Sequence, residues 1–166
     1  ILAGTVGTRD LNAKIDNQGA LTVDYPLTID KSSAAHTNSG TININDNLTL
    51  TQSGTAPSFT NSGTINIASG KTLSVNSGTF NHNTGSALTG SGTLSFSNVT
   101  VNLNAAEITN AVTGLAVTGS TFNGPGRLFN AAGKILSLYS TTINAALDNS
   151  GTLYTYTTNT INGALT

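Results

Sequence analysis

The stretch "TNSGTINI" occupies residues 37–44, and the same eight letters return at residues 60–67. Within the first copy, Ile42 and Ile44 alternate with polar residues, which is the period of a short strand with one face turned inward. The "NSG" before the strand contains Asn and Gly, which tolerate the positive φ angles that turns require. The repeated octapeptide therefore predicts the same corner and the same strand at two places in the chain.

A looser form of this unit, apolar–x–(Asn/Gly)–x–Gly–x–apolar, recurs along most of the chain. Its copies begin at Ile15, His36 (where His takes the apolar place), Phe59, Leu88, Phe122 and Leu147, and Leu165 opens a further copy. The starts are 21, 23, 29, 34, 25 and 18 residues apart. Residues 59–81 also align without a gap with residues 122–144, and ten of the 23 positions are identical. Such self-similarity indicates a repeat architecture.

Variable periods of 18–34 residues, short alternating strands and Gly/Asn corners predict an all-β fold, a parallel β-helix (β-solenoid) of about seven rungs. Each unit would form one rung, and equivalent residues would stack, because no rung buries its apolar residues alone. We expect two inward columns: Leu21, Ile42, Ile65, Leu94, Leu128 and Leu153; and Leu27, Leu48 and Leu73. The longest unit, residues 88–121, carries surplus sequence near residues 104–112, where we expect a short helix or a loop insertion.

The composition limits the class of protein. The chain of 166 residues suits one domain, and we interpret residues 1–166 as a single β-solenoid segment of a longer repeat protein. Only 8% of residues are charged, the net charge is −1 and the six Lys and Arg residues are scattered, so we expect no nucleic-acid binding. No apolar run approaches the ~20 residues that span a bilayer, so we expect no membrane span. The absence of Cys excludes disulfides and Cys-based metal sites.

The residues that carry chemistry form no recognisable catalytic pattern. Polysaccharide-cleaving chemistry needs paired carboxylates or a carboxylate cluster around Ca²⁺. The seven acidic residues form no column. Asp10, Asp16 and Asp24 fall near the first rung, where we interpret them as solvated turn residues; the alternative is that they converge there into one cluster. His36 occupies an inward position and is expected to be a corner or core histidine, whereas His82 is expected to be an exposed turn residue. We therefore expect no enzyme, no catalytic residue, no metal and no cofactor.

Outward threonines raise the alternative of ice binding. In the register of the repeat units they form two columns: Thr41, Thr64, Thr93 and Thr152; and Thr28, Thr49 and Thr72. Regular threonine ladders on a flat face can order water, but Thr is also a good strand former on a solvated face. Ala20 and Arg127 interrupt the first column, and Phe129 and Tyr154 fall in the second. A flat lattice match would not tolerate these side chains, so we expect the threonines to be strand formers only.

Aromatic residues are scarce, at 5% of the chain, yet several gather late in the sequence: Phe122, Phe129, Tyr139, Tyr154 and Tyr156. In the register of the repeat units, Phe129 and Tyr154 share an outward column, and Arg127 lies beside Phe129. Exposed aromatic rings next to an arginine can stack on sugars or anchor a protein partner. The candidate ligand-binding residues are therefore Arg127, Phe129, Tyr139, Tyr154 and Tyr156. The alternative is that some of these rings point inward or stack as a cross-strand ladder that stabilises the sheet.

Two stretches carry a family resemblance: "NSGTINIASGKTLSVNSGTF" at residues 61–80 and "NAAGKILSLYSTTINAALDNSGTLYTY" at residues 130–156. They resemble passenger regions of bacterial autotransporters and of filamentous-haemagglutinin-like exoproteins. The resemblance covers residues 15–166 and implies a right-handed parallel β-helix that is secreted, displayed on a bacterial cell surface and adhesive. The implied partner is a glycan or protein receptor on another cell or surface. No functional residue is carried over, because the chain contains no active-site or ligand motif of the family.

We therefore expect a structural or adhesive segment of a secreted or surface-displayed bacterial adhesin, which projects or forms a binding face. The alternative is a polysaccharide-binding or polysaccharide-degrading β-helix protein, with an ice-binding β-solenoid as the third candidate. Strand edges at an end of such a rod can pair with another copy, so end-to-end self-association is a further expectation.

Overall fold

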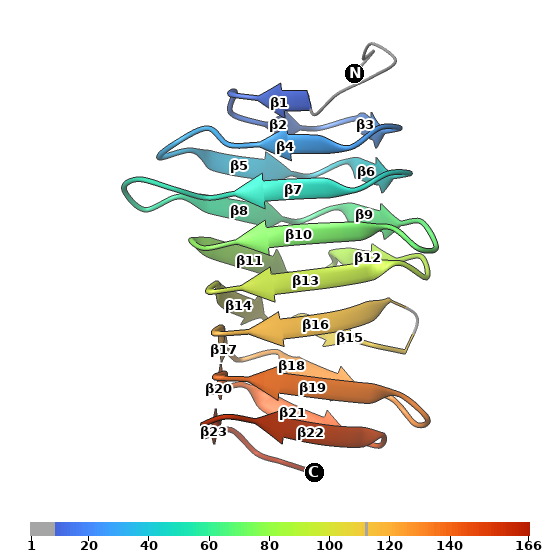
Figure 1. Cartoon of the computed structure of the whole chain (residues 1–166), viewed down its shortest axis with the longest axis vertical. Coiled ribbons are helices and arrows are strands. Elements are labelled where there is room, and N and C mark those ends of the chain that lie inside the picture. The colour runs from blue at the N-terminus through green and yellow to red at the C-terminus, as the bar shows by residue number, and fades with distance from the viewer. Residues whose placement is uncertain (1–8, 112) are drawn as a thin grey trace.

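The chain folds into a right-handed parallel β-helix of about seven turns. The structure, a computed structural model, describes residues 9–111 and 113–166, and this part of the chain contains 23 short strands and no helix. In Figure 1 the strands of the front sheet all point the same way, the chain returns behind them, and each turn lies below the one before. The predicted fold class is confirmed.

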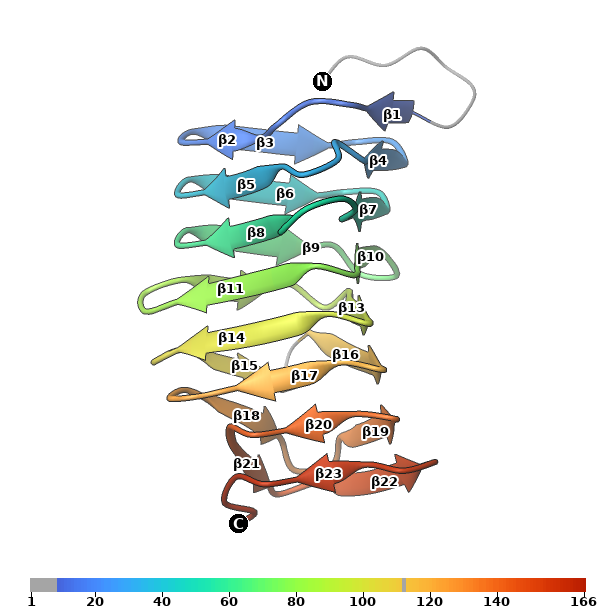
Figure 2. The same ribbon diagram turned by 90° about the vertical axis from the view of Figure 1, so that its left-hand side faces the viewer.

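Three faces run along the β-helix, and the chain visits them in the same order on every turn (Figure 2). Sheet A contains β1 (Arg9–Leu11), β4 (Leu27–Ile29), β7 (Leu48–Thr51), β10 (Thr72–Asn76), β13 (Thr93–Ser97), β16 (Gly114–Thr118), β19 (Ile135–Tyr139) and β22 (Thr152–Tyr156). Sheet B contains β2 (Asp16–Asn17), β5 (Ala35–Asn38), β8 (Ser58–Asn61), β11 (Thr79–Asn83), β14 (Thr100–Asn104), β17 (Thr121–Asn123), β20 (Thr142–Ile143) and β23 (Thr160–Ile161). The third face consists of sheet C, with β3 (Ala20–Val23), β6 (Thr41–Ile44), β9 (Thr64–Ile67) and β12 (Ala87–Thr89), and sheet D, with β15 (Glu107–Thr109), β18 (Arg127–Asn130) and β21 (Ala146–Asn149).

Most turns contain about 21 residues, and the separation of paired residues on adjacent turns ranges from 17 to 25. Asparagines that stack across sheet B are 21 residues apart on three successive turns. In sheet A, Leu48 pairs with Leu27, and Leu94 pairs with Leu73, at the same separation. The turn between these two pairs is longer, since the Thr72 N–H donates to Asn47 Oδ1 across 25 residues. The two aligned segments of the sequence lie three turns apart, because Phe59 reaches Phe122 through three successive pairings in sheet B.

Two of the predicted repeat units start at a different corner from the others. The units that begin at His36, Phe59 and Phe122 start in sheet B, whereas those that begin at Leu88 and Leu147 start on the third face. The period varies as predicted but over a narrower range than 18–34 residues, because paired residues on adjacent turns are 17 to 25 positions apart. Residues 88–121 span parts of more than one turn and do not form a single long rung.

The first predicted inward column is also wrong, because its residues are divided among sheets A, C and D. Leu94 pairs with Leu73 and Leu153 pairs with Leu136, so both belong to sheet A and neither stacks on Ile65. The third face has its own inward columns: Leu21, Ile42, Ile65 and Leu88 in sheet C, and Ile108, Leu128 and Leu147 in sheet D.

Glycine occurs at two kinds of corner, which explains why the sequence motif predicted the wrong register for some of the strands. A Cβ atom on Gly63, between sheets B and C, would clash with the carbonyl oxygen of Gly40 one turn away. A Cβ atom on Gly151, between sheets D and A, would clash with the carbonyl oxygen of Ala131. Both kinds of corner need glycine for the same close approach of backbones, so the motif marks a tight corner and not a complete turn.

Residues 104–112 do not form the predicted helix or loop insertion. They include strand β15 (Glu107–Thr109), in which Ile108 is buried and pairs with Leu128 of the next turn. Val112, which falls in the predicted range, lies outside the described residues. A strand with one inward residue shows too little alternation to be recognised in the sequence.

The inward side chains of the three faces meet in one apolar core. Phe59 and Phe80, on adjacent turns, stack with their ring centroids 5.7 Å apart. Phe96 and Phe122 meet edge to face at 5.8 Å. All four rings are buried. Each turn thus covers the apolar side chains of its neighbour, which is the main stabilising contribution in a repeat of this kind.

Asparagine side chains hydrogen bond from turn to turn inside the corners. Asn17 Nδ2 donates to Asn38 Oδ1 at 2.7 Å, and Asn38 Nδ2 donates to Asn61 Oδ1 at 2.7 Å. At the corner between sheets D and A, Asn110 Nδ2 donates to Asn130 Oδ1 at 2.5 Å. Asn38, Asn61, Asn110 and Asn130 are buried, so each amide needs a partner on the adjacent turn. The Asn of "TNSGTINI" recurs because each copy stacks on the previous one.

We predict that Asn38→Ala lowers the free energy of unfolding by roughly 2 kcal/mol, because the buried amide oxygen of Asn61 loses its donor. Asn43→Ala, on the outward side of the same turn, is the matched control and should change it by less than about 0.5 kcal/mol. Guanidinium unfolding followed by circular dichroism measures both. Equal effects of the two substitutions would show that the buried ladder does not stabilise the corner.

Candidate functional site

The predicted site residues separate into two clusters on different faces. Tyr139 lies on β19, and Tyr154 and Tyr156 lie on β22, all on the outward side of sheet A. Arg127 and Phe129 lie on β18 of sheet D. The structure therefore does not bring the five residues together into one site.

The predicted shared column of Phe129 and Tyr154 is wrong. Phe129 pairs with Asp148 in sheet D, whereas Tyr154 pairs with Ser137 in sheet A. The cause is the corner motif at residues 147–153, which lies one corner later in its turn than the similar motif at residues 122–128.

Phe122 does not belong to a surface cluster. It is fully buried and packs against Phe96 in the core. The neighbours Thr121 and Asn123 point outward, so the alternation on this strand turns Phe122 inward.

Three tyrosines form an exposed aromatic surface, which we call the tyrosine platform (Tyr139, Tyr154 and Tyr156). Their exposed fractions are 40%, 48% and 43%. The rings of Tyr139 and Tyr156 are parallel to within 6°, with centroids 4.5 Å apart, because the two residues pair directly across adjacent strands. The ring of Tyr154 lies 6.2 Å from that of Tyr156 at an angle of 47°. The sheet thus holds three phenol rings in fixed positions on the surface.

Alternation along the strands places these rings outward. Leu136 and Leu138 of β19 are buried, which leaves Tyr139 on the opposite side of the sheet. Leu153 of β22 packs against the core, and Tyr154 and Tyr156 follow on either side of Thr155. The stacked pair is the cross-strand aromatic ladder that the sequence left as an alternative, and it is also exposed.

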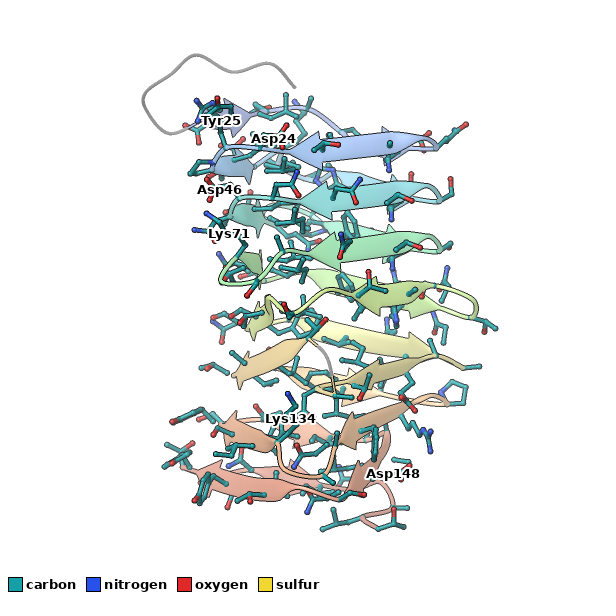
Figure 3. The ribbon with its side chains drawn as sticks, turned by 90° about the vertical axis from the view of Figure 1, so that its right-hand side faces the viewer. Asp24, Tyr25, Asp46, Lys71, Lys134 and Asp148 are labelled. Carbon is teal, nitrogen blue, oxygen red and sulfur yellow. The ribbon has the colours of Figure 1, made fainter. Side chains whose placement is uncertain are left out.

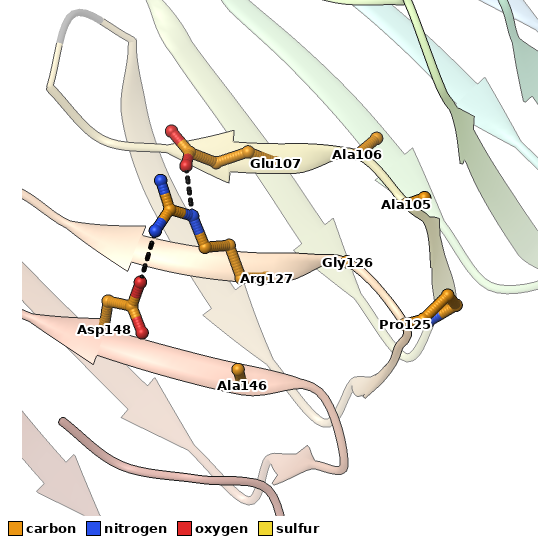
Figure 4. A pocket seen from close by; sticks show the side chains of 8 residues that line it. All are labelled: Ala105, Ala106, Glu107, Pro125, Gly126, Arg127, Ala146 and Asp148. Atoms are coloured by element: carbon orange, nitrogen blue, oxygen red, sulfur yellow. Dashed lines mark hydrogen bonds and ion pairs between the residues drawn. The ribbon is translucent and has the colours of Figure 1, made fainter.

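Arg127 joins two carboxylates in what we call the ion bridge (Glu107, Arg127 and Asp148), shown in Figure 4. Arg127 Nε donates to Glu107 Oε2 at 2.5 Å, and Arg127 Nη1 donates to Asp148 Oδ2 at 2.7 Å. The hydrogen bond to Glu107 is the main cause that raises the pKa of Arg127 above its ordinary value. The Arg127 guanidinium also lies 5.8 Å from the ring centroid of Phe129. The bridge ties three consecutive strands together on the outside of sheet D.

A hollow of about 550 Å³ lies beside the ion bridge. Its other lining residues are small or compact: Ala105, Ala106, Pro125, Gly126 and Ala146. Both carboxylates bind the same guanidinium, so the hollow presents ion-paired polar groups and no free nucleophile or acid–base pair.

Arg127 was predicted from the sequence as a site residue, whereas its two partners were not. Glu107 and Asp148 lie one turn before and one turn after Arg127, at separations of 20 and 21 positions in the sequence. A search for opposite charges one turn apart would have found the bridge. The stacking of turns also brings Lys71 Nζ within 2.8 Å of Asp46 Oδ1, and the hydrogen bond from Lys71 is the main cause that lowers the pKa of Asp46.

Charged residues concentrate on the third face and at its corner with sheet A, as Figure 3 shows for Asp24, Asp46, Lys71, Lys134 and Asp148. Asp24 accepts a hydrogen bond of 2.8 Å from Asn45 Nδ2 and lies at the corner between β3 and β4, as predicted. Asp10 and Asp16 were also predicted to be turn residues, and this is wrong, because they lie on strands β1 and β2. Within residues 9–111 and 113–166, no group of three or more His, Asp or Glu side chains could hold a metal ion.

The two histidines are both buried, so one prediction is confirmed and the other is wrong. His36 lies inward in sheet B as expected, and its Nδ1 accepts a hydrogen bond from the Ile15 N–H at 3.1 Å. Burial is the main cause that lowers the pKa of His36, and Lys14 lowers it further. His82 was expected to be an exposed turn residue, but it points inward from β11 with an exposed fraction of 1%. The outward Asn81 and Asn83 on either side required this orientation.

His82 lies at the end of the buried asparagine ladder. Asn61 Nδ2 lies 3.4 Å from His82 Nδ1, and Ser86 Oγ lies 2.9 Å from the same nitrogen. Burial lowers the pKa of His82 to about 4, because the charged imidazolium would lose its hydration. The imidazole is therefore neutral in the folded protein near neutral pH.

No helix in the described part of the chain is long and apolar enough to cross a membrane. Comparisons of the sequence with protein families and with curated proteins, and of the structure with solved structures, give no match.

We predict that the protein loses roughly 2 kcal/mol of stability between about pH 7 and pH 5 through His82. The folded-state pKa is depressed, so the unfolded chain binds a proton first as the pH falls below about 6.5 and the unfolded state gains stability. Denaturant unfolding midpoints at both pH values measure the effect. The variant His82→Asn should weaken this pH dependence, since Asn adds no titrating group. An unchanged pH dependence in His82→Asn would contradict the assignment.

Proposed function

We propose that the chain is a non-enzymatic segment of a secreted or surface-displayed bacterial adhesin, and that the tyrosine platform is its contact with a glycan. The observation that carries this proposal is the stacked, solvent-exposed pair Tyr139 and Tyr156, with Tyr154 beside it on the same sheet. Tyrosine provides a large, rigid contact area with a polar tip, and little side-chain entropy is lost when it binds. Tyrosine rings that are already held in place by the sheet lose still less side-chain entropy on binding.

The rod-like scaffold supports a role in presentation. Sheets A and B each continue through eight parallel strands, so the platform is part of one hydrogen-bonded structure that extends along the whole described chain. The regular β-helix supports the resemblance to autotransporter passengers and filamentous-haemagglutinin-like proteins at the level of the fold. Secretion and display on a bacterial surface are part of the same proposal.

A neutral glycan is the receptor that best fits the chemistry of the platform. The three phenol hydroxyl groups can donate or accept hydrogen bonds, and the ring faces offer apolar surface to the C–H face of a sugar. The two strands that carry the platform, β19 and β22, contain no charged residue. The ion bridge on sheet D belongs to a different face.

The test is binding of the purified protein to a broad glycan array. We predict that Tyr154→Ala and Tyr156→Ala each lower the affinity for the bound glycan by roughly tenfold, because truncation of a central aromatic residue removes a main anchor of an interface. Tyr25→Ala is the matched control, since Tyr25 is equally exposed (45%) but lies on the corner between β3 and β4. It should bind as the unaltered protein does.

Two outcomes would contradict the proposal. Absence of binding to every glycan would remove the platform as a lectin-like site, and equal losses in all three variants would indicate a non-specific effect. Depolymerisation of an acidic polysaccharide by the protein would favour the alternative of a polysaccharide-degrading β-helix.

A further inference from the structure

The outward side of sheet B carries two unbroken columns that the sequence register did not reveal. One column is threonine on five consecutive turns: Thr79, Thr100, Thr121, Thr142 and Thr160. Two positions further along the chain on each turn lies a column of asparagines: Asn81, Asn102, Asn123, Asn144 and Asn162. Every one of these turns therefore presents the same Thr-x-Asn triplet. We call the ten outward residues the Thr/Asn face, and it lies on the side of the molecule turned toward the viewer in Figure 2.

Hydrogen bonds between turns hold the asparagines in one conformation. Asn81 Nδ2 donates to Thr60 Oγ1 on the preceding turn at 3.2 Å. From Asn102 on, each Nδ2 donates to the Oδ1 of the asparagine on the preceding turn, at 2.8 Å from Asn102 to Asn81 and 3.1 Å from Asn123 to Asn102. The next two bonds, from Asn144 and from Asn162, measure 2.9 and 2.8 Å. An amide has two donor hydrogens and two acceptor lone pairs, so each side chain in the ladder retains unused capacity that faces solvent.

The five threonines lie on the outward side of sheet B as well. Within the described residues, the hydroxyl groups of the five threonines form no hydrogen bond to protein. The side chain of Thr is β-branched, which restricts its rotamers. The result is a row of hydroxyl groups spaced by the ~4.8 Å between turns, beside a row of amides ~6.6 Å away along the strand.

Neither charge nor an aromatic ring interrupts this surface. From β5 to β23 the outward residues of sheet B are only Ala, Ser, Thr and Asn, and the charged Asp16 lies on β2 at the far end. A charged ligand would find no counter-charge here, and a sugar would find no ring to stack on. The ligand that fits is neutral, periodic in two directions and built of hydrogen-bond donors and acceptors.

We propose that the Thr/Asn face binds ice. Water held at regularly spaced hydroxyl and amide groups makes hydrogen bonds nearly as favourable as direct ones, and the ordering here is repeated over ten side chains. The side chains that argued against ice binding in the sequence do not lie on this face. Ala20 and Arg127 belong to the third face, as does Phe129, and Tyr154 belongs to sheet A. This inference concerns another face from the tyrosine platform and is independent of the proposed glycan binding.

Ice growth in solutions of the purified protein tests the proposal. The unaltered protein should shape single ice crystals and produce a measurable thermal hysteresis. Thr121→Tyr introduces a bulky ring at the centre of the threonine column and should abolish both effects. Ala116→Tyr is the matched control, because Ala116 lies outward on sheet A in the same turn and receives the same side chain. It should behave as the unaltered protein does.

Circular dichroism and thermal unfolding of both variants exclude a loss of fold as the cause. Round, unshaped crystals in the unaltered protein would overturn the proposal, as would shaping that persists in Thr121→Tyr. Sedimentation provides the third readout. If the unaltered protein is a dimer in solution and Thr121→Tyr is a monomer, then a second copy covers this face, and the proposal of ice binding fails.

Discussion

The parallel hydrogen-bonded register between successive turns is the constraint on which the rest of the structure depends. Each residue of a strand lies directly against its equivalent on the preceding turn, so a side chain is always stacked on another from the same position of the repeat. Apolar columns form the core, and in a buried polar column each side chain must form its hydrogen bonds with the equivalent side chains on the adjacent turns. A chain under this constraint repeats short sequences because both the corner backbone and the column must match on every turn.

Buried amides show how the constraint admits polar groups into the interior. A single buried asparagine would leave unsatisfied donors and acceptors, whereas a column of them is self-complementary, since each Nδ2 meets the Oδ1 of its neighbour. Asn38 and Asn61 use this arrangement at one corner, and Asn110 and Asn130 use it at another. His82 ends the first ladder as a neutral imidazole, which links the integrity of that corner to pH.

The three faces differ in chemistry because the backbone register does not fix which side chains occupy an outward column. Each face can therefore carry its own type of residue. Sheet A carries the tyrosine platform, sheet B carries the neutral Thr/Asn face, and the third face carries the ion bridge and much of the charge. Rigid strands support each of these surfaces, so little conformational entropy is lost when a partner binds. The chain contains few charged residues because hydroxyl and amide side chains make sheets A and B hydrophilic without ion pairs.

Local periodicity determined much about this protein. Alternation and Gly/Asn corners were sufficient for the parallel β-helix, its approximate number of turns, the inward His36 and the outward tyrosines. Tertiary structure decided the register, because the glycine corner motif serves two kinds of corner and only cross-turn pairing distinguishes them. That register separated Phe129 from Tyr154, joined Glu107 and Asp148 to Arg127, and aligned Thr121 with its neighbours. Which residues stack in one column depends on the pairing of strands one turn apart. The alternation of residues within a single strand does not determine that pairing.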